Sequence, residues 1–153
     1  LQRGAETLTV TSLPGRHAPG AAARVLPPVM GSLLEHRAAP DADPFRVYIS
    51  GDTLFIPELT RIVERYPNPD AMVVHLGGTR ILGLLVTMDD QQGADLLELV
   101  DPAVTVPVHF DDYSVFRSPL SDFRTEVDKR SAEGRIHSTV RYVTHGETVD
   151  LSL

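Results

Sequence analysis

Asp52, His75 and His109 each stand at or just after the end of a short apolar run rich in β-branched residues. Such a run predicts a buried strand, and Gly51 before Asp52 predicts a tight turn, because glycine adopts backbone angles that other residues resist. Ligands of an α/β sheet bind in the crevice outside the carboxyl ends of its strands. The sequence therefore predicts one site that collects these three side chains.

His17 has a similar placement, on a loop rich in proline and glycine that follows the expected strand Thr7–Leu13. Zinc, iron and manganese ions accept imidazole nitrogen and carboxylate oxygen, and a carboxylate can bridge two ions about 3.5–4 Å apart. His17, Asp52 and His109 therefore have the chemistry of a metal site, although their separations of 35 and 57 residues match no short ligand motif.

Each of these residues also has an ordinary structural interpretation. His109 at a strand end could bond to a backbone carbonyl, and Asp52 could be a turn carboxylate or the cap of a helix opened by Pro57. His17 in its loop could be solvated, and His75 could be a buried histidine with a satisfied ring. The coincidence of several metal-competent side chains at strand ends favours the site.

Length and composition narrow the classes of protein. The 153 residues suffice for one domain, and a net charge of −7 provides no basic stripe for nucleic acid. No cysteine is present, so a metal ion would be held by histidine and carboxylate. We find no run of 18 apolar residues and no signal peptide, and we expect a cytoplasmic protein without a membrane span.

Periodicity and breaker residues predict a mixed α/β order. The range 81–86 is too interrupted by glycine for an assignment. The end of the chain reads as a hairpin of two short strands. The expected strands are Thr7–Leu13, Val29–Arg37, Phe45–Ser50, Ala71–His75, Ala103–Val108, Thr139–Thr144 and Thr148–Leu151. The expected helices are Pro57–Tyr66, Gln91–Val100 with Thr87 or Asp89 as its cap, and Pro119–Glu133.

Four segments together resemble a known family. They are Pro-Gly-Arg-His17-Ala-Pro, Val-Tyr-Ile-Ser-Gly-Asp52-Thr, Val-Pro-Val-His109-Phe and a late Gly-Glu-Thr-Val. In this order they resemble the C-terminal half of the metallo-β-lactamase superfamily, nearest to its lactonase-like and N-acylphosphatidylethanolamine phospholipase D-like hydrolases. The resemblance implies that residues 1–153 form half of a four-layer αβ/βα sandwich, with a mixed sheet and helices on one face.

The same resemblance implies the roles of the site residues. His17 would complete a three-histidine first metal site, Asp52 would bridge two ions, and His109 would belong to the second site. The complete enzyme would hold two zinc ions, with iron or manganese as alternatives. A metal-bound hydroxide would hydrolyse a lactone, a phosphodiester or another ester or amide. Asp52 and His75 are the expected catalytic residues, His75 by orienting a ligand or touching a small-molecule substrate.

The chain departs from the family in one large respect. The signature His-x-His-x-Asp-His, which supplies the other four ligands, is absent from this sequence. We therefore expect a fragment of a longer enzyme, an interpretation that the missing initiator Met favours, or a degenerate half domain. Its exposed sheet face would pair with the missing N-terminal half or with a second copy. The alternative function is a non-catalytic half-sandwich that binds or dimerises without a metal site.

Overall fold

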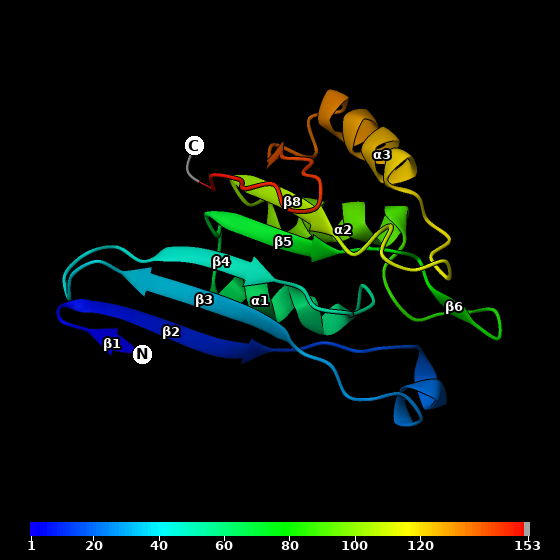
Figure 1. Cartoon of the computed structure of the whole chain (residues 1–153), viewed down its shortest axis with the longest axis horizontal. Helices are drawn as coiled ribbons and strands as arrows, with labels where there is room; N and C mark the ends of the chain where they lie inside the picture. The colour runs from blue at the N-terminus through cyan, green and yellow to red at the C-terminus, as the bar shows by residue number, and fades with distance from the viewer. Residues whose placement is uncertain (152–153) are drawn as a thin grey trace.

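The apolar runs of the sequence form the middle of one main sheet. The computed structural model describes residues 1–151, and its seven-stranded sheet has the order β1-β2-β3-β4-β5-β8-β9 (Figure 1). A separate two-stranded sheet joins β6 and β7. The strands are β1 Gln2–Arg3, β2 Glu6–Leu13, β3 Gly31–Arg37, β4 Phe45–Ile49, β5 Ala71–His75, β6 Arg80–Ile81, β7 Leu84–Leu85, β8 Val104–Val108 and β9 Thr139–Val140.

Strand direction changes across the main sheet. Strands β1 to β4 pair antiparallel, as hairpins do, whereas β4, β5, β8 and β9 pair parallel. In the parallel part Ile49 lies beside Val73, and Val73 lies beside Val106. The carboxyl ends of β4, β5 and β8 therefore meet at one edge of the sheet.

The helices are short. They are the 3₁₀ helices η1 Gly20–Arg24 and η2 Pro57–Leu59, and the α-helices α1 Thr60–Arg65, α2 Asp90–Val100 and α3 Leu120–Ala132. Asp89 caps α2, because its side chain accepts a hydrogen bond from the backbone N–H of Gln92 at 3.1 Å. No helix in the described part of the chain is long and apolar enough to cross a membrane.

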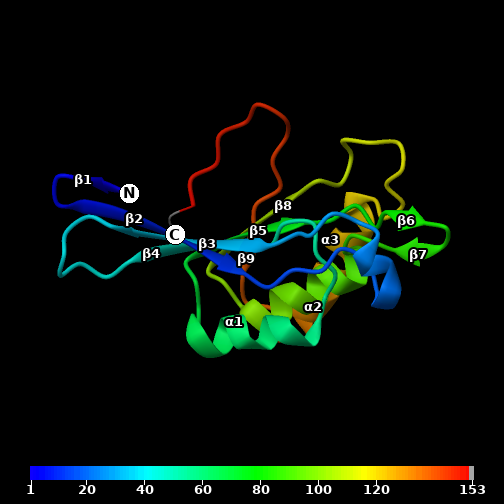
Figure 2. The same ribbon diagram turned by 90° about the horizontal axis from the view of Figure 1, so that it is seen from below.

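All three α-helices lie on one side of the main sheet, and the segment after β9 lies on the other (Figure 2). Leu33, Tyr48 and Met72 are neighbours across three strands, are fully buried, and belong to the core that the helices cover. The predicted mixed sheet with helices on one face is confirmed.

The opposite face of the sheet is apolar but less well covered. Along each strand side chains alternate between the two faces. Val47, Ile49 and Val73 therefore point away from the helices, and all three are only half-buried. Val10, on the same face, is 56% exposed. We refer to this side, defined by Val10, Val47, Ile49 and Val73, as the helix-free face.

The expected terminal hairpin is wrong. Only Thr139–Val140 forms a strand, β9, which pairs parallel with β8, and residues 148–151 are not a strand. A local turn replaces the hairpin, because the Glu147 carboxylate accepts hydrogen bonds from the backbone N–H and the hydroxyl of Thr144. Two smaller differences also stand: β6 and β7 form a hairpin where we assigned no structure, and the first helix begins as η2.

Arg130 is the buried charge of the helical layer. Its side chain is 5% exposed, and its guanidinium donates to Glu126 at 2.8 Å, Asp95 at 2.7 Å and Glu98 at 3.1 Å. The first partner lies on α3 itself and the other two on α2. The guanidinium therefore ties the two helices together through charge-assisted hydrogen bonds.

We expect Arg130→Ala to lower the free energy of unfolding by roughly 2–3 kcal/mol, because it removes a buried cation from among three carboxylates. Arg135→Ala is the matched control. Arg135 also pairs with Glu98, but its side chain is 45% exposed, so its loss should cost less than about 1 kcal/mol. Urea unfolding of both variants measures the difference, and equal losses would contradict the assignment.

Candidate metal centre

Asp52 lies at the sheet edge because the chain turns sharply after β4. Gly51 has a φ of +64°, and a Cβ atom there would lie 2.5 Å from the carbonyl oxygen of Met30. After the turn, the Thr53 hydroxyl accepts a hydrogen bond from the backbone N–H of Arg16 at 2.8 Å. Asp52 does not cap the following helix, since η2 begins after Ile56 without a side-chain cap. That alternative for Asp52 is excluded.

His109 comes to Asp52 from the end of β8. Its Nδ1 atom lies 3.7 Å from Asp52 Oδ1 and 3.3 Å from the carbonyl oxygen of Leu76. The residue has a φ of +60°, a backbone conformation that is costly for any residue with a Cβ atom. His109 therefore has the expected backbone carbonyl partner, Leu76, and the Asp52 carboxylate lies beside it.

His75 is the third member of this group. Its ring centroid lies 5.8 Å from that of His109, and its backbone N–H donates to Ser50 Oγ at 2.9 Å. Burial lowers the pKa of the His75 imidazole below its ordinary value of 6.5, and the neighbouring His109 lowers it further. Asp52 and Asp112 act in the opposite direction. The net shift favours a neutral ring near pH 7.

His17 approaches the same edge through its backbone neighbour. Arg16 both donates to Thr53 and accepts a hydrogen bond from the backbone N–H of Leu54 at 2.8 Å, so the His17 loop runs beside the turn that carries Asp52. Among residues 1–151, the buried Nδ1 atoms of His17 and His75 have no hydrogen-bond partner. An unpaired buried ring nitrogen is expensive, and a cation or a substrate would satisfy it.

The three expected ligands do not form a tight cluster. In the described part of the chain, one group of three side chains has its metal-competent atoms all within 4.8 Å: Asp111, Asp112 and His145. All three residues are exposed. Asp52 and His109 are thus brought together, while His17 lies on the adjacent loop and stays a predicted ligand.

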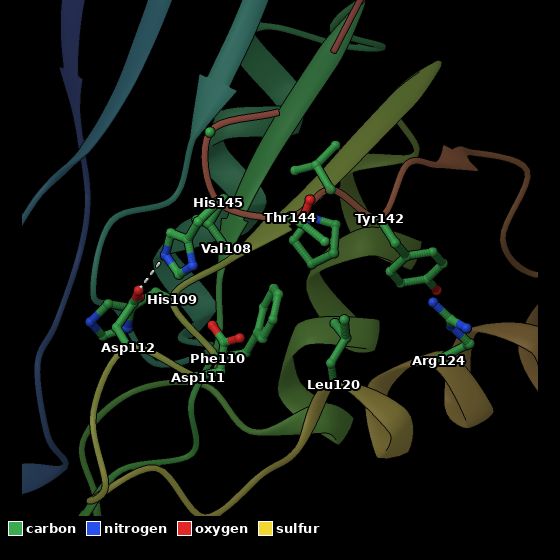
Figure 3. Close-up of a pocket in the computed structure, with 13 residues that line it drawn as sticks. Val108, His109, Phe110, Asp111, Asp112, Leu120, Arg124, Tyr142, Thr144 and His145 are labelled. Carbon is green, nitrogen blue, oxygen red and sulfur yellow. Dashed lines mark hydrogen bonds and ion pairs between the residues drawn. The ribbon is translucent and has the colours of Figure 1, made fainter. Parts of the chain in front are cut away.

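His145 is exposed, and its partner was not foreseen from the sequence. His145 Nε2 lies 2.9 Å from Asp112 Oδ1 across 33 residues of sequence (Figure 3). This contact depends on the loop after β9 folding back over β8. No local motif signals it.

A cavity of about 880 Å³ opens beside His109. Figure 3 shows His109 and Asp112 at one end and Arg124 with Tyr142 at the other. The Arg124 guanidinium carbon lies 4.2 Å from the centroid of the Tyr142 ring. The cavity has the size of a small-molecule site, and it adjoins the candidate metal centre at His109.

Comparison with known proteins bears on this arrangement. No protein-family model matches the chain. A UPF0173 metal-dependent hydrolase of Halobacterium salinarum is 30% identical over 112 residues, which are 73% of this chain and 42% of that protein. Igni18, a metallo hydrolase from the hyperthermophilic archaeon Ignicoccus hospitalis, is 26% identical with a TM-score of 0.67, and the match covers 93% of this chain and 52% of that one.

The fold itself has a known relative. The metallo-β-lactamase fold protein YhfI from Bacillus subtilis superposes with a TM-score of 0.52 at 12% identity, over 94% of this chain and 48% of that one. The chain has the metallo-β-lactamase fold. It spans about two fifths of the length of the Halobacterium relative. The Halobacterium relative is named a metal-dependent hydrolase, and Igni18 is named a metallo hydrolase.

We expect the His75 ring to titrate below 6.5 in the metal-free protein, because burial disfavours its charged form. NMR titration of the imidazole measures this pKa. The unfolded chain then binds the proton more readily, so this group destabilises the fold as pH falls from 6.5 through the lowered pKa. Asp52→Asn should lower the pKa further, and a value at or above 6.5 in the wild type would contradict the assignment.

Proposed function

We propose that the chain carries part of the active site of a zinc-dependent hydrolase, with His17, Asp52 and His109 as metal ligands. The observation that carries this proposal is the 3.7 Å approach of His109 to Asp52 at the ends of two parallel strands. This approach brings a carboxylate and an imidazole to one place at the sheet edge, and zinc accepts ligands of both kinds at about 2.0–2.2 Å. The unpaired Nδ1 atom of His17, on the adjacent loop, supports its inclusion.

A bound divalent cation would activate water for hydrolysis and polarise the scissile group of the substrate. The protein residues supply the rest. Asp52 holds its negative charge at the sheet edge, and its side chain is 38% exposed, so a ligand can reach it. The lowered pKa of His75 favours a neutral ring near pH 7, and a neutral imidazole has one nitrogen that can accept a proton.

The substrate is a small molecule with an ester, lactone, phosphodiester or amide bond, held in the cavity beside His109. A lactonase-like or phospholipase D-like relationship is the one we favour within the superfamily. The cavity offers apolar contacts from Phe110 and Leu120 between its two polar ends. A substrate with an apolar body and a polar reacting group matches this lining.

We further propose that residues 1–153 are the C-terminal half of an αβ/βα sandwich and that the helix-free face packs against the other half or a second copy. Half-buried Val47, Ile49 and Val73 form an apolar strip across neighbouring strands on this face. A strip of this kind is covered in a stable protein. The missing half would also supply the remaining ligands.

Asp52→Asn tests the metal site. In the full-length protein we expect the variant to lose most of its bound zinc and to hydrolyse substrate at least 10³-fold more slowly, because a neutral amide is a poor ligand. Elemental analysis and turnover of a lactone and phosphodiester panel measure both effects. Asp41→Asn, the same exchange on an exposed loop, is the control. If Asp52→Asn kept full metal content and activity, the non-catalytic alternative would stand.

Val47→Glu tests the sandwich. A carboxylate buried between two sheets should lower the free energy of unfolding of the full-length protein by roughly 3 kcal/mol or more, whereas an exposed one costs little. Val25→Glu is the control, since Val25 is 86% exposed beside η1. Equal urea midpoints for the two variants would mean that the helix-free face is open.

A further inference from the structure

The strained backbone of His109 requires a restraint. A φ of +60° carries a cost of about 1 kcal/mol or more for a residue with a Cβ atom, and it persists where the surroundings fix it. The Leu76 carbonyl oxygen lies 3.3 Å from Nδ1. The Phe116 ring packs against the imidazole with ring centroids 4.6 Å apart. The imidazole therefore contacts both a hydrogen-bond acceptor and an aromatic ring.

Phe116 is itself seated on the Gly77–Gly78 turn that follows β5. The Gly77 carbonyl oxygen accepts hydrogen bonds from the backbone N–H groups of Arg117 at 2.8 Å and Ser118 at 3.2 Å. A Cβ atom at Gly77 would lie 2.9 Å from the His109 carbonyl oxygen and 3.0 Å from the Phe116 ring. Only a glycine leaves room for this approach.

The turn against which Phe116 packs is connected to helix α2 through Ser118. At Gly78 a Cβ atom would lie 2.6 Å from Ser118 Cβ, so this position also needs glycine. The Ser118 hydroxyl oxygen accepts a hydrogen bond from the backbone N–H of Asp90 at 2.8 Å, at the start of α2. A continuous set of contacts therefore runs from α2 through Ser118 and Gly77 to Phe116 and His109.

The surroundings of Nδ1 decide where its proton lies. Leu76 O and Asp52 Oδ1 are the two acceptors that face this atom, at 3.3 Å and 3.7 Å. A carbonyl oxygen can only accept, so the bonded Nδ1 carries the proton and the Nε2 lone pair is left free. An imidazole that donates one N–H to a carbonyl is oriented and made more basic for a cation at its other nitrogen.

We propose that Phe116, seated on the Gly77–Gly78 turn, is a positioning residue that confines the His109 ring with Nδ1–H on the Leu76 carbonyl and Nε2 available to a metal ion. This role rests on the proposed function only for its last step, the use of Nε2. The confinement of the ring is a property of this chain with or without metal.

The test compares Phe116→Ala with Val115→Ala in the full-length protein. Val115 is 53% exposed and next to Phe116 in sequence, which makes it a matched truncation. We expect Phe116→Ala to weaken zinc affinity 10- to 100-fold in competition with a chromophoric chelator, and Val115→Ala to leave it unchanged. Phe116→Tyr, which keeps the ring, should restore the affinity.

A second readout separates positioning from simple stability. In the metal-free protein, the ¹⁵N shifts of the His109 ring should report an Nδ1–H tautomer in the wild type and an average of two tautomers in Phe116→Ala. An Nε2–H wild type, or a Phe116→Ala protein with unchanged affinity and tautomer, would overturn the proposal. If His109→Ala kept full zinc affinity, the proposed metal site would be wrong. The tautomer measurement on the metal-free protein would still test whether Phe116 restrains the His109 ring.

Discussion

The parallel pairing of β4, β5 and β8 is the constraint on which the rest of the structure depends. Because the three strands run the same way in register, their carboxyl ends meet at one edge. Asp52, His75 and His109 come from chain positions far apart, yet His75 ends β5, His109 directly follows β8, and Asp52 needs only a short turn after β4 to reach that edge. The helices α1 and α2 connect these strands and cover the opposite side of the sheet from the helix-free face. The helix-covered core therefore lies on one side of the sheet, and the helix-free face lies on the other.

The strands and helices with clear periodicity were predictable from the sequence. The strand Ala71–His75 has the expected bounds, and Asp89 caps α2 as one of the two expected residues. The terminal hairpin failed because its residues have strand propensity, but their hydrogen bonds go elsewhere. The backbone N–H of Thr139 donates to Ala103, just before β8, the N–H of Arg141 donates to Thr105 in β8, and Glu147 closes a local turn on Thr144. Such competition between partners is decided by tertiary contacts, which local pattern does not contain.

The residues of the candidate site were predictable from the sequence, but the contacts that hold them in place were not. Strand ends identify Asp52, His75 and His109, because the chain itself marks where each strand stops. The seat of Phe116 depends on how closely two loops approach, and a pair of glycines in sequence is compatible with many turns. The pairing of His145 with Asp112 depends likewise on a loop that returns from β9. The contacts of the buried Arg130 with Asp95 and Glu98 depend in the same way on how α3 packs against α2.

The side of the sheet that lacks helices is also the side on which the site opens. His75 follows Val73 by two residues on β5, so both side chains point to the helix-free face. Any element that covers Val73 therefore also closes over His75 and limits the access of water to it. Exclusion of water strengthens the electrostatic interactions among Asp52, His75 and His109 and the attraction of a cation to them. Under the proposed sandwich, covering the apolar face and completing the metal centre are one event, and metal affinity becomes part of the stability of the assembled fold.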